Sequence, residues 1–240
     1  MAESTLTVTT SDGPMEIYEA APDADARGAV IVVQEAFGVN DHIRDVTRRF
    51  ATAGFHGVAP AFFHRAGGGV ADYSDFGSVI KLFDGVTDDS TLADTDATID
   101  HLRERGFDDR QIGIVGFCWG GRVTFLVSAR RAIGAGVGFY GGGIVSTRFP
   151  QFPALSADCK QLQTPWLGLF GDQDQSIPVT DVDTLRVQLE DVPVDTDVVL
   201  YEGAGHGFFC DQRDSFHSDA AADGWTRALA WFDKHLTSDR

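Results

Sequence analysis

The stretch Ile112-Gly113-Ile114-Val115-Gly116-Phe117-Cys118-Trp119-Gly120-Gly121-Arg122 begins as a short apolar run and ends in the pattern Gly-x-Cys-x-Gly. It predicts a buried strand that turns sharply into a helix. Gly116 and Gly120 stand two residues before and after Cys118, where small residues let the strand and helix backbones pass closely. We therefore expect Cys118 on a strained, exposed turn at a helix N-terminus, where the helix dipole favours a thiolate.

The same stretch also has a plainer interpretation. A glycine-rich turn between a strand and a helix can carry a small buried Cys, because free cysteines are among the most buried residue types. The motif alone does not decide between a nucleophile and a packing residue. The rest of the chain therefore has to show whether Cys118 has reactive partners.

Short apolar runs alternate with helical patterns along the chain, which indicates an α/β fold, a mostly parallel sheet with helices on both faces. After an opening hairpin, strands are expected at 29–33, 57–60, 112–117, 135–140, 166–170 and 198–201. Helices are expected from 43, from 91 to 105, after Cys118, after 180 and from 221, with Thr91 and Asp94 capping the second and residues 180–183 capping the fourth. The polar connection 146–163 is typical of a loop that covers something. No composition break divides residues 1–240, so we expect a single domain.

Composition narrows the possible partners and location. A net charge of −17 and an isoelectric point near 4.5 argue against nucleic acid and anionic membranes. No secretory signal and no run of about 18 apolar residues is visible. The three cysteines do not have the spacing of a zinc site or of a set of disulfides, which fits a reducing compartment. We expect a cytoplasmic protein, a monomer or small homo-oligomer, that uses no cofactor and no metal, since no residue cluster has ligand spacing.

Four polar residues stand just after apolar strands: Glu35, Cys118, Asp174 and His206. Reactive residues of such sheets lie at the carboxyl ends of the strands, so we expect these four to meet. Each has an ordinary explanation by itself, because an Asp can order a turn and a His between glycines can bind backbone. The order nucleophile, acid, histidine is that of the α/β-hydrolases, and the four together indicate a catalytic set.

Five segments make this pattern specific: Gln34-Glu35-x-Phe37-Gly38-x-Asn40, Gly116-Phe117-Cys118-Trp119-Gly120-Gly121, Phe139-Tyr140-Gly141, Gly171-Asp172-Gln173-Asp174 and Gly205-His206-Gly207-Phe208. With them the chain resembles the dienelactone hydrolase (carboxymethylenebutenolidase) family of the α/β-hydrolase superfamily, from residue 34 to the last helix. The resemblance implies a triad of Cys118, His206 and Asp174. It favours Asp174 over Asp172, because the family's acid stands three residues after the glycine that matches Gly171.

These residues support the hydrolysis of a small ester or enol-lactone through a thioester. A Cys118 thiolate attacks the carbonyl, His206 relays the proton that the leaving alkoxide needs, and Asp174 fixes the imidazole. We expect the backbone amides of Trp119 and Ala36 to hold the oxyanion.

Glu35 has two interpretations. The resemblance implies that it contacts the thiol of Cys118. A carboxylate there disfavours the thiolate, yet it can accept the thiol proton when a substrate arrives. Our hypothesis is a gate in which Cys118 rests as a thiol until Glu35 takes its proton. Alternatively, Glu35 orders its loop by binding backbone amides.

Substrate contacts are also suggested by the resemblance. Arg65 matches a family arginine that pairs with the substrate carboxylate, and a planar guanidinium suits that bidentate contact. Its alternative is a surface arginine beside a glycine loop. Phe37, Tyr140 and Phe208 are expected to contact the substrate as well.

The chain departs from the family at one position. Cys210 stands where the family has a second arginine, and Arg213 is another candidate for the same pocket. Two further functions therefore stay open. One is a broader carboxylesterase or thioesterase with the same triad, and the other is a non-catalytic ligand-binding or redox-sensing protein in which Cys118 is oxidised and Cys210 resolves it.

Overall fold

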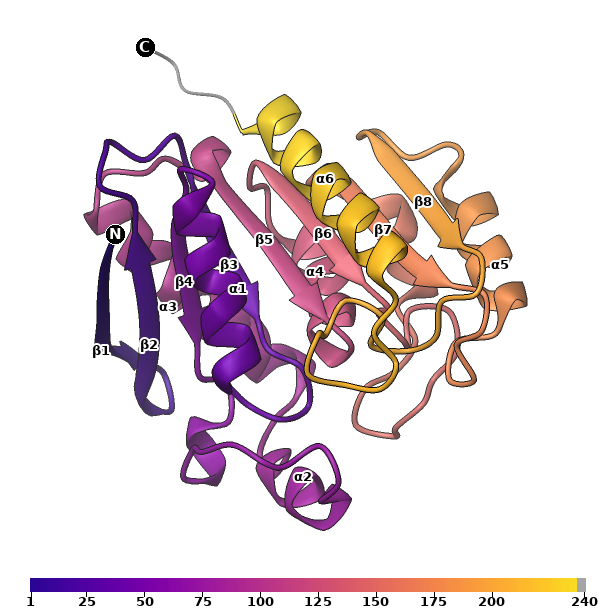
Figure 1. The fold of residues 1–240 in the computed structure, drawn as a ribbon, viewed down its shortest axis with the longest axis horizontal. Helices are drawn as coiled ribbons and strands as arrows, with labels where there is room; N and C mark the ends of the chain where they lie inside the picture. The colour runs from indigo at the N-terminus through magenta and orange to yellow at the C-terminus, as the bar shows by residue number, and fades with distance from the viewer. Residues whose placement is uncertain (237–240) are drawn as a thin grey trace.

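The computed structural model describes residues 1–236, apart from the side chain of Phe76. Within this part of the chain, eight strands form one sheet in the order β1-β2-β4-β3-β5-β6-β7-β8 (Figure 1). The strands β1 and β2 pair antiparallel, as do β2 and β4, and all other neighbours are parallel. The strands are β1 (Ala2–Thr10), β2 (Gly13–Ala21), β3 (Ala29–Val33), β4 (His56–Pro60), β5 (Ile112–Phe117), β6 (Ala135–Phe139), β7 (Trp166–Gly171) and β8 (Thr196–Tyr201).

Helices cover both faces of the sheet, which confirms the predicted α/β architecture. One face carries α1 and α6, and the other carries α3 and α4 (Figure 1). No helix in the described residues has the length and apolar character that crossing a bilayer requires. The helices are α1 (Asp41–Thr52), α2 (Phe76–Leu82), α3 (Asp88–Glu104), α4 (Trp119–Arg130), α5 (Val179–Leu189) and α6 (Ser218–His235), with the short 3-10 helices η1 (His64–Ala66), η2 (Asp109–Gln111) and η3 (Ser156–Gln161).

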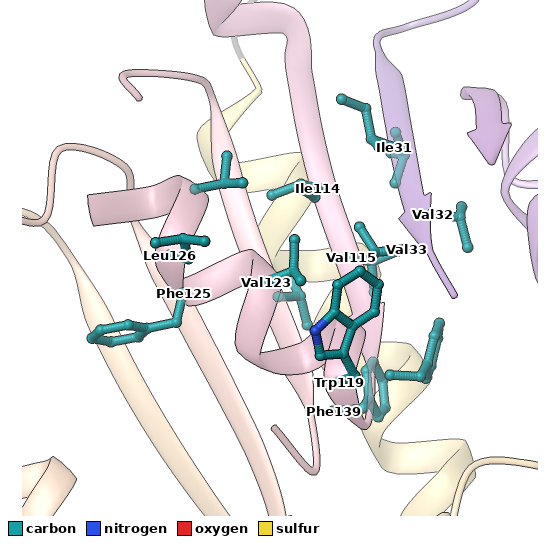
Figure 2. Packing of buried hydrophobic residues seen from close by; sticks show 14 of the residues in the cluster. Ile31, Val32, Val33, Ile114, Val115, Trp119, Val123, Phe125, Leu126 and Phe139 are labelled. Carbon is teal, nitrogen blue, oxygen red and sulfur yellow. The ribbon is translucent and has the colours of Figure 1, made fainter. Parts of the chain in front are cut away.

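The central strands are apolar on both sides because both sides are covered. All five residues of β3 are buried, and Figure 2 shows its side chains close to those of β5 and α4. Val33, the last residue of β3, is the register partner of Gly116 in β5. The segment after β3 therefore starts beside the turn after β5, which brings Glu35 and Cys118 to the same edge of the sheet.

The helix α3 begins earlier than the sequence predicted. Thr87 accepts a hydrogen bond from the Ser90 amide at 3.1 Å, and the Ser90 hydroxyl accepts one from the Thr87 amide at 2.9 Å. This capping box replaces the predicted cap at Thr91 and Asp94, which is wrong. Thr91 instead lies in the first turn, where its hydroxyl donates to the Thr87 carbonyl at 2.7 Å.

The predicted cap of α5 is also wrong. The helix begins at Val179, directly after Pro178, and no side chain caps it. A proline fits the start of a helix because its φ is already near the helical value and no amide is lost to the helix there. Residues 180–183 are therefore helical and do not form the cap.

Candidate active site

Cys118 lies on the turn between β5 and α4 in a strained backbone conformation. Its φ of 55° and ψ of −116° are unusual for a residue with a side chain. A Cβ atom at Gly116 would lie 2.1 Å from the Gly120 carbonyl oxygen, and one at Gly120 would lie 2.5 Å from the Gln34 carbonyl oxygen. Both positions need glycine because the backbones pass so closely. The predicted turn is therefore confirmed, and close backbone packing holds Cys118 in its strained conformation.

Asp174 and His206 follow the ends of β7 and β8 and bind each other. Nδ1 of His206 lies 2.7 Å from Oδ2 of Asp174, whose side chain is almost fully buried. The other oxygen of Asp174 accepts hydrogen bonds from the amide and hydroxyl of Ser176, at 2.8 and 2.6 Å. Asp172 instead accepts from the Gly203 amide at 2.8 Å. The structure thus pairs His206 with Asp174, the acid that the resemblance favours, and gives Asp172 a role in the neighbouring turn.

The charges of this group favour a protonated imidazole. Burial alone would lower the pKa of His206, but the charge of Cys118 and the hydrogen bond with Asp174 raise it to about 10. Burial would raise the pKa of Asp174, but its hydrogen bond and charge interaction with His206 hold that pKa below the usual value. The His206 ring therefore interacts with both the Asp174 carboxylate and the Cys118 sulfur.

Cys118, Asp174 and His206 border one cavity of about 750 Å³, within the size range of small-molecule sites. Trp119 and Ala36 border it too. Trp119 is the first residue of α4, so its amide has no partner within the helix. The apolar part of the wall comes from Phe37, Val79, Ile80, Phe83, Phe149 and Phe152.

Two segments beyond the carboxyl ends of the strands close this cavity. One is the connection 146–163, which contributes Arg148, Phe149, Gln151 and Phe152 to the wall and so confirms the prediction that this connection covers something. The other contains α2, which lies beyond the sheet in Figure 1. No element was predicted for this second segment, although Phe76, Val79, Ile80 and Phe83 stand at helical spacing in it.

Glu35 is fully buried beside the site, and its partner is Arg213. Oε1 of Glu35 accepts a hydrogen bond from Nη1 of Arg213 at 3.3 Å, and Oε2 has no hydrogen-bond partner among the described residues. Burial raises the pKa of Glu35, and the charge of Arg213 opposes that rise. Gly207 makes room for the contact, because a Cβ atom there would lie 2.7 Å from Nη1 of Arg213. No described hydrogen bond joins Glu35 to Cys118.

Arg65 does not border the cavity. Its guanidinium donates two hydrogen bonds to Asp94, at 2.6 and 2.9 Å, and a third to Asp12 at 2.6 Å. In place of the expected substrate contact, Arg65 joins η1 to α3 and to the turn of the opening hairpin. The sequence did not show this role because Asp12 and Asp94 are far from Arg65 along the chain.

Two of the three aromatic residues expected at the substrate lie outside the cavity. Tyr140 and Phe208 are fully buried and do not border the cavity, whereas Phe37 does. The Tyr140 ring lies 5.1 Å from the rings of both His206 and Phe208, and its φ is 38°. Tyr140 therefore packs against the His206 ring, and Phe208 packs against Tyr140.

Arg122 is a site residue that the sequence reasoning missed. It is almost fully buried on α4, four residues after Cys118, and borders the cavity. It donates to Asp88 at 2.6 and 3.0 Å, to the Pro153 carbonyl at 2.5 Å and to the Gly143 carbonyl at 3.3 Å. Arg122 thereby joins α4 to the start of α3 and to the connection 146–163. A charged residue among the apolar residues in the first half of this helix is the signal that could have identified it, because a buried charge needs partners.

Cys210 occupies a closed position. It is fully buried, its sulfur lies 3.3 Å from the Tyr73 hydroxyl, and it does not border the cavity. All three cysteines are free. This placement gives no support for Cys210 as the partner of an oxidised Cys118. Among the described residues, no three His, Cys, Asp or Glu side chains are grouped so that they could hold a metal ion.

Comparisons with known proteins agree with this geometry. Residues 15–236 match the model of the dienelactone hydrolase family. A relative from Yersinia pestis named as a candidate carboxymethylenebutenolidase is 37% identical over 238 residues, covering 97% of this chain and 88% of its own. A relative from Escherichia coli strain K12, named in the same way, is 39% identical over 232 residues, covering 94% and 79%.

A solved structure is similar along its whole length. The crystal structure of a candidate dienelactone hydrolase from Klebsiella pneumoniae matches with a TM-score of 0.89 at 35% identity, covering 98% of this chain and 99% of that one. The fold, the family model and the relatives lead to one conclusion. The chain belongs to the dienelactone hydrolase family, and it is a hydrolase with the α/β-hydrolase fold.

Proposed function

We propose that this hydrolase cleaves small esters and enol-lactones of the dienelactone type through a thioester on Cys118. The observation that carries the proposal is a strained cysteine that shares one cavity with a buried acid–histidine pair. The names of the relatives support the substrate class. The cavity is also large enough for the bulkier esters of a broader carboxylesterase, and those belong to the same chemistry.

The reaction follows from the groups at the cavity. The Cys118 thiolate attacks the carbonyl carbon, and the amides of Trp119 and Ala36 bind the oxyanion that forms. When this intermediate collapses, the bond to the leaving oxygen breaks and that oxygen takes a proton from His206. Water then attacks the thioester while His206 accepts its proton, the carbon–sulfur bond breaks, and the acid leaves. Asp174 keeps the imidazole oriented and stabilises its charged form.

Glu35 is proposed as a second proton acceptor for Cys118. A buried carboxyl with a raised pKa binds a proton more readily than an exposed one. In the resting arrangement, however, Arg213 holds Oε1 of Glu35. The gate therefore requires a substrate that draws Arg213 away, after which Glu35 takes the thiol proton.

Hydrolysis of 4-nitrophenyl acetate and of a five-membered enol-lactone tests the proposal. Cys118→Ala is expected to lower kcat/KM at least about 1,000-fold, since the nucleophile is removed. Mass spectrometry after a rapid acid quench should find one acetyl group on the wild type and none on this variant. Cys159→Ala is the matched control, because Cys159 is buried away from the cavity and hydrogen bonds to Gln188. Equal rates for Cys118→Ala and the wild type would disprove the proposal.

A further inference from the structure

Ser176 contacts both members of the acid–histidine pair. Its hydroxyl donates a hydrogen bond to Oδ1 of Asp174 at 2.6 Å, and the same hydroxyl oxygen lies 3.1 Å from Nδ1 of His206. The Ser176 amide also donates to Oδ1 of Asp174, at 2.8 Å. Both donors of Ser176 therefore bind one oxygen of the carboxylate, and the other oxygen, Oδ2, is left to bind His206 at 2.7 Å.

The direction of these hydrogen bonds determines which nitrogen of His206 carries the proton. The hydroxyl of Ser176 has one proton, and it points to Asp174. Toward His206 the Ser176 oxygen therefore presents its lone pairs, which accept a hydrogen bond. The Asp174 carboxylate is an acceptor too, because its pKa is held below the usual value. Two acceptors at Nδ1 keep the ring proton on that nitrogen, so Nε2 is left to exchange protons in the reaction.

The turn that contains Ser176 has a counterpart elsewhere in the chain. The amide of Ser74 donates to Oδ1 of Asp72 at 2.8 Å, and its hydroxyl donates to the same atom at 2.5 Å. Asp72 and Ser74 are exposed and do not border the cavity. Such a contact between Asp and a residue two positions later is common in turns. Ser176 differs from Ser74 in its contact with His206 and in its place at the cavity.

The other groups that face His206 do not orient the acid. The Cys118 sulfur is the second hydrogen-bond partner of His206, the charge of Glu35 acts on it, and the Tyr140 ring lies 5.1 Å away. Among the described residues, only His206 and Ser176 give hydrogen bonds to the Asp174 carboxylate. The orientation of the carboxylate toward the imidazole therefore depends on Ser176.

We propose that Ser176 is a positioning residue of the hydrolysis, which acts through Asp174 and His206. This inference rests on the proposed function, because it assigns a role within the same catalytic group. The hydroxyl of Ser176 turns the carboxylate so that Oδ2 faces the imidazole. It also keeps Nδ1 protonated while Nε2 gives and takes the proton. Ser176 itself forms no bond with the substrate and gives it no proton.

Two variants of nearly equal shape test this role. Ser176→Thr keeps a hydroxyl and Ser176→Val has a methyl group in its place, so the two differ in the hydrogen bond and hardly in packing. With 4-nitrophenyl acetate, we expect Ser176→Val to lower kcat about tenfold and to leave KM within about twofold, because the pair acts in the chemical steps. Ser176→Thr should keep kcat within about threefold of the wild type.

A second measurement shows whether Ser176 acts through the acid. In a chain that already carries Asp174→Asn, Ser176→Val should lower kcat further by less than about twofold, because residues that act as one unit have non-additive effects. Ser74→Val is the matched control. It removes the corresponding contact with Asp72, and kcat should stay at the wild-type value.

Three results would overturn the role of Ser176 while the hydrolase stands. They are equal kcat values for Ser176→Val and Ser176→Thr, a loss with Ser74→Val as large as that with Ser176→Val, and losses from Ser176→Val and Asp174→Asn that multiply. The proposed function has its own test in Cys118→Ala. If that variant hydrolyses the ester as fast as the wild type, the proposed function fails, and the role of Ser176 fails with it.

Discussion

Several buried carboxylates of the described chain bind histidines, and two of them, Asp174 and Glu19, have different roles. Asp174 binds His206 at 2.7 Å beside the cavity. Glu19, on β2, binds His101 at 3.1 Å and His56 at 3.3 Å, between β2, β4 and α3. The two pairings are similar in distance and burial. A carboxylate–histidine contact is therefore not enough to make a reactive site.

The two regions differ in the other partners of the histidine and in the pKa that results. Both oxygens of each carboxylate are used within the protein, since Oε1 of Glu19 also accepts from Ser4 at 2.9 Å and from Arg105 at 2.7 Å, and Oδ1 of Asp174 accepts from Ser176. Burial lowers the pKa of His56 although Glu19 opposes it, whereas the pKa of His206 is raised to about 10 against the effect of burial. A second partner of His206, the sulfur of Cys118, makes that difference.

The backbone separates the two regions as well. Among the described residues other than glycine, Cys118 and Tyr140 alone have positive φ values, and both belong to the site. Glu19 lies in a regular strand whose register with β1 and β4 is unbroken. Backbone strain persists only where the surrounding packing enforces it. Here it is concentrated at Cys118, the proposed nucleophile, and at Tyr140, which packs against His206.

The largest effect expected comes from breaking the Asp174–His206 pair. Asp174→Asn should lower kcat about 1,000- to 10,000-fold, because the imidazole loses its orientation and the stabilisation of its charge. His206 acts as an acid while protonated, so activity is expected below its pKa and should be lost as the pH rises through about 10. In the variant this alkaline limb of kcat/KM should move down by about 1 pH unit or more.

Asp172→Asn is the control for this experiment. It makes the same chemical change two residues away, and its remaining oxygen can still accept from the Gly203 amide. The rate and the alkaline limb should stay near those of the wild type. A loss with Asp172→Asn as large as that with Asp174→Asn would contradict the assignment of the acid.

A smaller effect is expected at Glu35. Glu35→Gln should lower kcat/KM for 4-nitrophenyl acetate about tenfold, because the second proton acceptor is gone. At the same time, alkylation of Cys118 by iodoacetamide near neutral pH should become several-fold faster, because the negative charge that disfavours the thiolate is removed. If alkylation is unchanged while hydrolysis falls, the gate is wrong, and Glu35 only orders its loop and holds Arg213.

The parts of the molecule that the sequence predicted are those that local patterns determine. The β-branched run at 29–33 is a strand buried on both faces. Glycines are needed at 116 and 120 because the backbones of β5 and α4 pass so closely there. Residues that follow strand ends in a parallel sheet come together at one edge, which is why Cys118, Asp174 and His206 could be grouped in advance.

The contacts that could not be predicted from the sequence are those between charged residues that come together only after folding. Arg65 and Arg148 are both arginines near glycine-containing loops, and nothing local shows that the first finds Asp94 while the second stays unpaired. The contact of Glu35 with Arg213 joins residues 178 positions apart. Pairing across such distances depends on which loops pack together, so neither hydropathy nor spacing predicted it.

The smallest effect on activity is expected at Glu19, where the consequence should be one of stability. Glu19→Gln should leave kcat/KM within about twofold of the wild type, because the cluster has no contact with the cavity. The free energy of unfolding at pH 7 should fall by about 1–3 kcal/mol, since four hydrogen bonds to a buried carboxylate lose their charge. Urea denaturation measures this change directly.

The pH dependence shows whether the charge of Glu19 is the cause. Burial would raise its pKa, but His101, Ser4 and Arg105 hold it below the ordinary value of 4.5. A carboxyl whose pKa is lowered in the folded state stabilises it fully above that ordinary value, and the stabilisation is lost as the pH falls through the folded pKa. The difference in the free energy of unfolding between wild type and Glu19→Gln should therefore be constant from pH 7 to pH 5. It should become smaller below about pH 4.5. A gap that does not change with pH would mean that packing, and not charge, makes this cluster structural.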